Sequence, residues 1–112
     1  MTLVEKIDRA ISWNDMTNAL DGKWRENLSL SETRAWVDKC FLIYEHHGFA
    51  KTFKPCYSDY KEMDGMNFTV VRRANTDDVD MEQLPMWLIK FDNGKETFAF
   101  PEEIALDERK IA

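Results

Sequence analysis

The chain has 112 residues, of which 44% are hydrophobic and 12% aromatic, and its formal net charge is −6. This length fits one domain and is too short for two with separate cores, and the aromatic residues supply enough apolar surface for folding without disulfides. No basic start followed by an apolar segment opens the chain, and no apolar run is long enough to cross a bilayer, so a cytoplasmic protein is expected.

Charge is distributed unevenly along the chain. Residues 74–108 contain ten acidic residues against Lys90 and Lys95, a local excess of eight negative charges. The rest of the chain carries eleven acidic and thirteen basic residues, a net charge of about +2. Such a run often marks solvated loops and helix ends, but it also fits an anionic surface that binds a basic partner.

Two helices are expected near the N-terminus. Thr2 and Glu5 have the spacing of a capping box, and apolar residues then recur at helical spacing over about 3–12. A short second helix should follow, because Asn14 and Asp15 are residue types that favour an N-cap.

A longer helix is expected over about 30–47. Ser29 and Glu32 form a second capping box, apolar residues follow at steps of three and four, and Gly48 is placed to end the helix. The connection before this helix contains Trp24, which we expect to be its anchor. The apolar stripe of the helix is wide enough to need a sheet to cover it.

After Gly48 the period of the apolar residues changes to that of strands. Residues 66–73 predict a strand with Phe68, Val70 and Arg72 on one face. Residues 75–83 are acidic and poor in apolar side chains, which predicts a mobile loop.

A β-hairpin is the clearest local prediction. Asn93-Gly94 lies between runs in which apolar residues alternate, and both of these residue types accept the positive φ of a two-residue turn. With that turn, four apolar residues share one face. The expected pairs are Ile89 with Phe98 and Trp87 with Phe100.

Helices followed by a meander of strands predict a single α+β domain over 1–112, with an antiparallel sheet. Residues 1–48 form its helical part and residues 49–112 its β part. Pro101 suits the first position of a short C-terminal helix or 3-10 turn.

Three stretches of the β part resemble small SH3-like or Tudor-like barrels. They are Gly65-x-x-Phe68-x-Val70, Pro85-Met86-Trp87-x-Ile89-x-Phe91-x-x-Gly94 and Phe98-x-Phe100-Pro101-Glu102-Glu103-Ile104. The resemblance implies that the sheet, on which the helices pack, is a partly open SH3-like barrel; the alternative is a plain antiparallel sheet. The same stretches are similar to segments of short accessory proteins of phages and conjugative elements of Gram-positive bacteria. That group includes anti-CRISPR inhibitors of Cas9, which implies a bacterial host cell.

No residue pattern commits the chain to a reaction, a metal or a cofactor. His46 and His47 are adjacent, so on a helix they point about 100° apart and do not share one ion easily. Residues 77–82 lack the central glycine and the final glutamate of a calcium loop. Cys56 has no recognisable base, orienting acid or oxyanion loop around it. A non-catalytic protein without a cofactor is therefore expected.

Two sets of residues are candidates for binding. The first is an acidic set for a protein partner with a basic groove, such as Cas9, and consists of Asp77, Asp78, Asp80, Glu82, Glu102 and Glu103. The second is a basic set for RNA, DNA or a peptide, interleaved with tyrosines, and consists of Lys51, Lys54, Arg72 and Arg73. The overall negative charge favours the first set, because binding to a phosphate backbone needs a positive field.

Overall fold

The computed structural model describes residues 1–106 and has the predicted α+β class, with helices in the N-terminal part and strands in the C-terminal part. The chain divides into two compact units, Met1–His46 and His47–Ala112. The boundary lies beside Gly48, where the sequence predicts the change from helices to strands.

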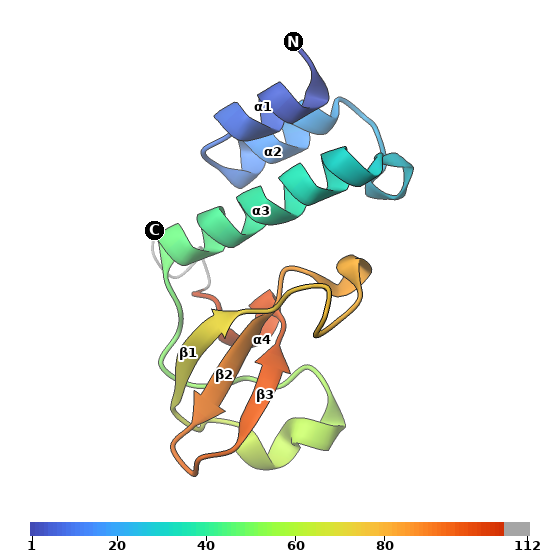
Figure 1. Cartoon of the computed structure of the whole chain (residues 1–112). Coiled ribbons are helices and arrows are strands. Elements are labelled where there is room, and N and C mark those ends of the chain that lie inside the picture. Colours follow the sequence, from blue (N-terminus) through green and yellow to red (C-terminus); the bar gives the residue numbers. More distant parts are fainter. Residues whose placement is uncertain (107–112) are drawn as a thin grey trace. The chain divides into compact units, whose positions relative to one another are not determined.

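The first unit contains three helices (Figure 1). They are α1 (Leu3–Arg9), α2 (Trp13–Leu20) and α3 (Leu30–His47), and a short 3-10 helix, η1 (Arg25–Asn27), precedes α3. The bounds of α3 are those predicted. No helix in the described part of the chain is both long and apolar enough to cross a membrane.

Both predicted capping boxes are confirmed. The Thr2 hydroxyl accepts the N–H of Glu5 at 3.2 Å, and the Glu5 carboxylate accepts the N–H of Thr2. Ser29 and Glu32 make the same two bonds at 3.2 and 2.9 Å, so local hydrogen bonds fix where α1 and α3 begin.

Three details of this unit differ from the predictions. Helix α1 ends at Arg9, because Ala10 is extended. Helix α2 begins at Trp13, because the Ser12 hydroxyl accepts the N–H of Asp15 at 3.2 Å and caps the helix instead of a later residue. Trp24 is 73% exposed, so it does not anchor the connection. The buried core of the unit consists of Ile7, Ala10, Met16, Ala19, Cys40 and Ile43.

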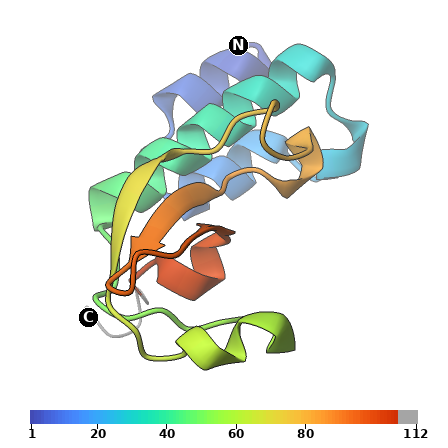
Figure 2. The same cartoon turned by 60° about the horizontal axis from the view of Figure 1, so that its bottom comes forward.

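The second unit is built on an open three-stranded antiparallel sheet. Its strands are β1 (Phe68–Arg73), β2 (Trp87–Phe91) and β3 (Glu96–Ala99), in the order β1-β2-β3. Figures 1 and 2 both show β2 in the middle of the sheet. A short helix, α4 (Pro101–Ile104), follows β3 and begins with proline as predicted.

Segments outside the strands complete this unit. Isolated antiparallel bridges pair Phe49 with Ala105 and Thr52 with Asn67. Two further 3-10 helices lie in the connections: η2 (Ser58–Met63) before β1, and η3 (Met81–Gln83) between β1 and β2.

Alternate residues of β2 are buried in the second unit. Trp87, Ile89 and Phe91 are at most 2% exposed, and Ala99 of β3 is fully buried. The ring of Phe53 packs edge-on against Phe91, with 5.0 Å between the ring centroids. The three β2 side chains and Ala99 form one face of the sheet, as strand periodicity requires, and Phe53 packs against it.

The turn of the β2–β3 hairpin is one residue longer than predicted. The N–H of Phe91 donates to the carbonyl of Lys95 at 2.8 Å, and the N–H of Gly94 donates to the carbonyl of Phe91 at 2.9 Å. Gly94 has a φ of 88°, whereas Asn93 does not have a positive φ. This is the pattern of a three-residue loop that ends in a left-handed glycine.

The longer turn shifts the register, so the predicted pairs are wrong. Ile89 lies opposite Thr97, and Trp87 lies opposite Ala99. Phe98 lies opposite Leu88 and therefore points to the other face of the sheet from Ile89.

A bulge in β1 also moves Arg72 from its predicted face. Val70 pairs with Ile89, whereas Arg72 pairs with Leu88, so Val71 is the extra residue. Because Leu88 and Ile89 point to opposite faces, Arg72 and Val70 do as well. The prediction that they share a face is therefore wrong.

Candidate functional site

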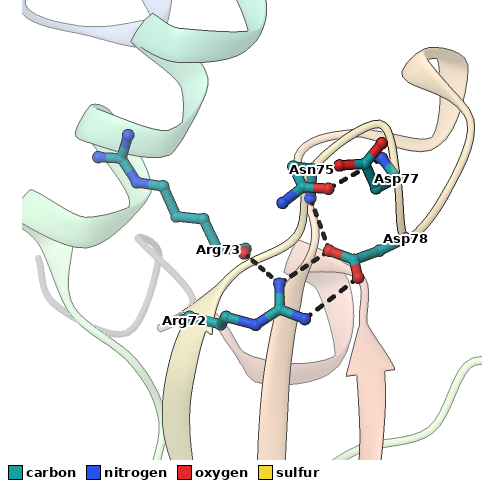
Figure 3. A network of polar contacts seen from close by, with 5 residues as sticks. All are labelled: Arg72, Arg73, Asn75, Asp77 and Asp78. Atoms are coloured by element: carbon teal, nitrogen blue, oxygen red, sulfur yellow. Dashed lines mark hydrogen bonds and ion pairs between the residues drawn. The ribbon is translucent and has the colours of Figure 1, made fainter.

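The connection between β1 and β2 holds four of the six acidic residues in the first candidate set. We call residues 75–83 the acidic connection, and it contains no lysine or arginine. It begins with a turn in which the N–H of Asp78 donates to the Asn75 carbonyl at 3.0 Å. The Asn75 side chain accepts the N–H of Asp77 at 2.8 Å (Figure 3). The segment predicted as a loop therefore has defined local structure, which η3 continues.

Arg72 and Asp78 join the acidic connection to the end of β1. Nη1 of Arg72 lies 2.7 Å from Oδ2 of Asp78, and Nη2 lies 3.1 Å from Oδ1, so the ion pair is bidentate (Figure 3). The Asp78 carboxylate also accepts the N–H of Asn75 at 3.0 Å. The Arg72 contact and then the Asn75 bond lower the pKa of Asp78 to about 2. The negative charge of Asp78 is thus matched locally.

The remaining acidic residues of the connection are exposed. Asp77, Asp80 and Glu82 all lie at the surface. None of the three forms an ion pair within residues 1–106. The acidic connection therefore presents three carboxylates that no basic side chain of this described range neutralises.

Glu102 and Glu103 both lie in α4 but have different environments. Glu102 is exposed. Glu103 is 4% exposed, and its carboxylate accepts the N–H of Phe100 at 2.9 Å and that of Cys56 at 3.1 Å. The Glu103 carboxylate therefore links the start of α4 to the segment that contains Cys56. The sequence predicts that Glu103 belongs to the partner-binding set, whereas its carboxylate is buried and bonded within the protein.

The basic set is not assembled into one patch. Lys51 and Lys54 are exposed in the segment before η2, and the N–H of Lys54 donates to the carbonyl of Glu103 at 3.0 Å. Arg72 forms a bidentate ion pair with Asp78. The side chain of Arg73 points away from the Arg72 guanidinium, as expected for successive residues of a strand (Figure 3).

A groove of about 360 Å³ lies in the second unit, and the sequence pattern does not predict it. Tyr57 and Phe100 line it with ring centroids 6.0 Å apart. Its other lining residues are Asp59, Tyr60, Gln83, Met86, Thr97, Phe98 and Glu103. The tyrosines stand out in the sequence among basic residues, but the predicted hairpin register places Phe98 and Phe100 in the core. The groove depends on the observed register of the β2–β3 hairpin, which places Phe98 on the opposite face of the sheet from Ile89.

Two observations concern metal ligands and the Cys56 thiol. Within residues 1–106, no three His, Cys, Asp or Glu side chains converge as a potential metal site. Desolvation, with a smaller effect of Glu103 and Glu102, raises the pKa of the exposed Cys56 thiol. A raised pKa keeps this thiol protonated and makes it a weaker nucleophile at neutral pH.

No protein-family model, curated protein or solved structure matches this chain at significant similarity.

Proposed function

We propose that this chain is a non-catalytic interaction protein whose acidic connection binds a basic surface of a protein partner. The observation that carries the proposal is the set of three exposed carboxylates without ion pairs in residues 1–106, those of Asp77, Asp80 and Glu82. Asp77 lies in a hydrogen-bonded turn that is tied to β1 through Arg72, and Asp80 and Glu82 follow that turn. A segment that already has its bound conformation loses less conformational entropy on association.

The charge layout supports a partner of opposite sign. The acidic connection carries no basic residue, and Arg72 neutralises Asp78 but leaves the other three carboxylates. Complementary fields accelerate encounter between proteins and suppress binding to partners of the wrong charge. The field of exposed charges is screened over about 10 Å at 0.1 M salt, so the proposed binding weakens as salt rises.

The resemblance of the β part to accessory proteins of mobile elements supports a more specific form of the proposal. In this form the protein is an inhibitor encoded by a phage or mobile element. It occupies the basic groove of a host protein that handles nucleic acid, such as Cas9. The acidic connection would then compete with the phosphate backbone for the same lysine and arginine side chains.

The test is a binding measurement with a charge-reversed variant. The variant combines Asp77→Lys, Asp80→Lys and Glu82→Lys. Its control reverses three exposed acids elsewhere in the second unit, Glu62→Lys, Asp64→Lys and Asp92→Lys, and so has the same net charge. Each tagged protein is incubated with bacterial lysate, and separately with guide-free and guide-loaded Cas9, and washed across a salt series.

We expect the wild type and the control to retain a basic partner and the variant to bind it roughly tenfold more weakly, from the loss of three exposed charge contacts. Retention of guide-free Cas9, with reduced binding of the guide-loaded form, would identify the partner. Equal retention by the variant and the control at every salt concentration would contradict the proposal.

A second candidate function is binding of RNA or single-stranded DNA through Lys51, Lys54, Arg72 and Arg73. The exposed Tyr57 favours it, because bases stack on aromatic side chains. The pairing of Arg72 with Asp78 weakens it. A gel shift with single-stranded RNA tests it, since Lys51→Glu with Lys54→Glu should abolish any complex while reversal of the acidic connection should not.

A further inference from the structure

The outer edge of β3 has backbone groups without a partner in residues 1–106. β3 is an edge strand of the open sheet (Figure 1). The bond from the Phe91 N–H to the Lys95 carbonyl sets the alternation of the antiparallel ladder, so Thr97 bonds toward β2. Glu96 and Phe98 then direct their N–H and carbonyl groups outward, and neither residue has a backbone hydrogen bond in that direction within residues 1–106. Such an edge is a template for another strand.

The aromatic groove runs along this same edge. Thr97 and Phe98 are successive residues of β3, so their side chains point to opposite faces of the sheet, yet both line the groove. The groove therefore follows the edge of β3 and is not confined to one face. The segment around η2 also lines the groove, with the exposed side chains of Tyr57 and Tyr60.

The groove is suited to a positive ligand. Asp59 lines it, and no lysine or arginine is among its lining residues in the described part of the chain. Glu96 is exposed on the edge strand itself. However, Asp78 and, to a smaller extent, Glu96 raise the pKa of the Arg72 guanidinium, which lies 5.8 Å from the centre of the Phe98 ring. The charge that favours a positive ligand is therefore that of Asp59. Glu103 also lines the groove, but its carboxylate is already bonded to two backbone N–H groups. Tyrosine faces beside a carboxylate attract cations by their quadrupole and by direct charge.

We propose that the edge of β3 and the adjoining groove bind an extended peptide segment of a partner protein that alternates apolar and basic residues. The segment adds to the sheet as a fourth strand, through backbone hydrogen bonds to Glu96 and Phe98. A basic side chain of the segment lies against the tyrosine rings and pairs with Asp59. Of the residues concerned, Gln83 alone lies in the acidic connection, and the proposal does not rest on that connection binding a partner.

A synthetic peptide is the probe. It has eight residues in which valine alternates with arginine, and its ends are acetylated and amidated. Three relatives serve as controls: one has glutamate in place of arginine, and two have N-methyl groups on alternate backbone amides, one in each register. In one register, methylation removes the donors that strand addition to β3 needs, and in the other it removes only donors on the far edge; both keep the side chains.

Amide NMR spectra report where the peptide binds and whether the protein is folded. We expect the arginine peptide to shift the amide signals of Glu96 and Phe98 and to slow the exchange of their N–H protons with solvent by at least tenfold. The glutamate peptide should leave these amides unchanged, and so should the methylated peptide whose N-methyl groups fall on the amides that face β3. The peptide methylated in the other register keeps those donors and should bind. The variant Asp59→Lys should weaken binding roughly three- to tenfold, by loss of the ion pair and cation attraction. Its control is Glu62→Lys, the same change in η2 outside the groove, which should bind like the wild type.

Three results would overturn the proposal. Binding of both methylated peptides as tightly as the parent would exclude strand addition. Signal changes that avoid β3 would place the peptide elsewhere. Shifts of Glu96 and Phe98 that depend on the protein's own concentration without peptide would make a second copy of this chain the occupant. The variant with three charge reversals in the acidic connection should still bind the peptide, so failure of one proposal is distinguishable from failure of the other.

Discussion

Removal of the Glu103 carboxylate should destabilise the protein far more than removal of its neighbour. In Glu103→Ala, the backbone N–H groups of Phe100 and Cys56 both lose the acceptors that lie at 2.9 and 3.1 Å. A buried donor left without a partner costs about 1–3 kcal/mol, and charged acceptors lie in the upper part of that range. Cys56 is exposed, so water restores part of its bond. We therefore expect a loss of about 2–4 kcal/mol in the free energy of unfolding.

Glu102→Ala is the matched control, because Glu102 lies in the same first turn of α4, carries the same charge and is exposed. Its expected effect is within about 0.5 kcal/mol. Glu103→Gln keeps the size of the side chain but only one carbonyl acceptor, so its loss should be intermediate. Urea unfolding followed by tryptophan fluorescence measures all three variants. If Glu103→Ala and Glu102→Ala differ by less than about 0.5 kcal/mol, the two Glu103 bonds do not stabilise the fold to this extent.

Two further predictions concern the acidic connection and the hairpin. The pKa of Asp78 is lowered from 3.8 to about 2, so the ion pair with Arg72 adds stability that is complete above pH 3.8 and is lost as pH falls through about 2. In Arg72→Gln, an NMR titration of the carboxyl carbon should show the pKa of Asp78 raised toward 3.8, and an unchanged pKa would mean that Arg72 does not cause the shift. Gly94→Ala should destabilise by about 1–2 kcal/mol, because alanine is strained at a φ of 88°. Gly94→Asn should lose less, since asparagine tolerates this conformation, and equal melting temperatures of the two variants would exclude backbone strain.

The helices of the first unit could be predicted from the sequence because their signals are local. Thr2 with Glu5, and Ser29 with Glu32, lie three residues apart, and the bonds between them form within one turn. The predicted start of α2 was wrong, because another capping residue lies two positions earlier. Ser12 is the N-cap of α2, because its extended backbone lets the hydroxyl accept the N–H of Asp15. The sequence alone did not favour Ser12 over Asn14 and Asp15 as the N-cap residue.

The candidate surfaces were predictable only in part. The sequence places Asp77, Asp80 and Glu82 in a connection between strands, and these residues are exposed. It could not show that Arg72 neutralises Asp78, because the bulge at Val71 decides on which face Arg72 lies. A one-residue change in register or a bulge sends a side chain to the opposite face, and sequence period does not detect either.

The sequence by itself determined the α+β class, the bounds of α3, the existence of the β2–β3 hairpin and the concentration of acidic residues after β1. Each of these depends on residues within a few positions of one another or on composition. The tertiary structure alone decided the burial of Glu103, which bonds to Cys56 across 47 residues of chain, and the groove beside β3. Contacts between such distant segments depend on how the elements pack, and the register that positions Phe98 in the groove is set by the geometry of one turn.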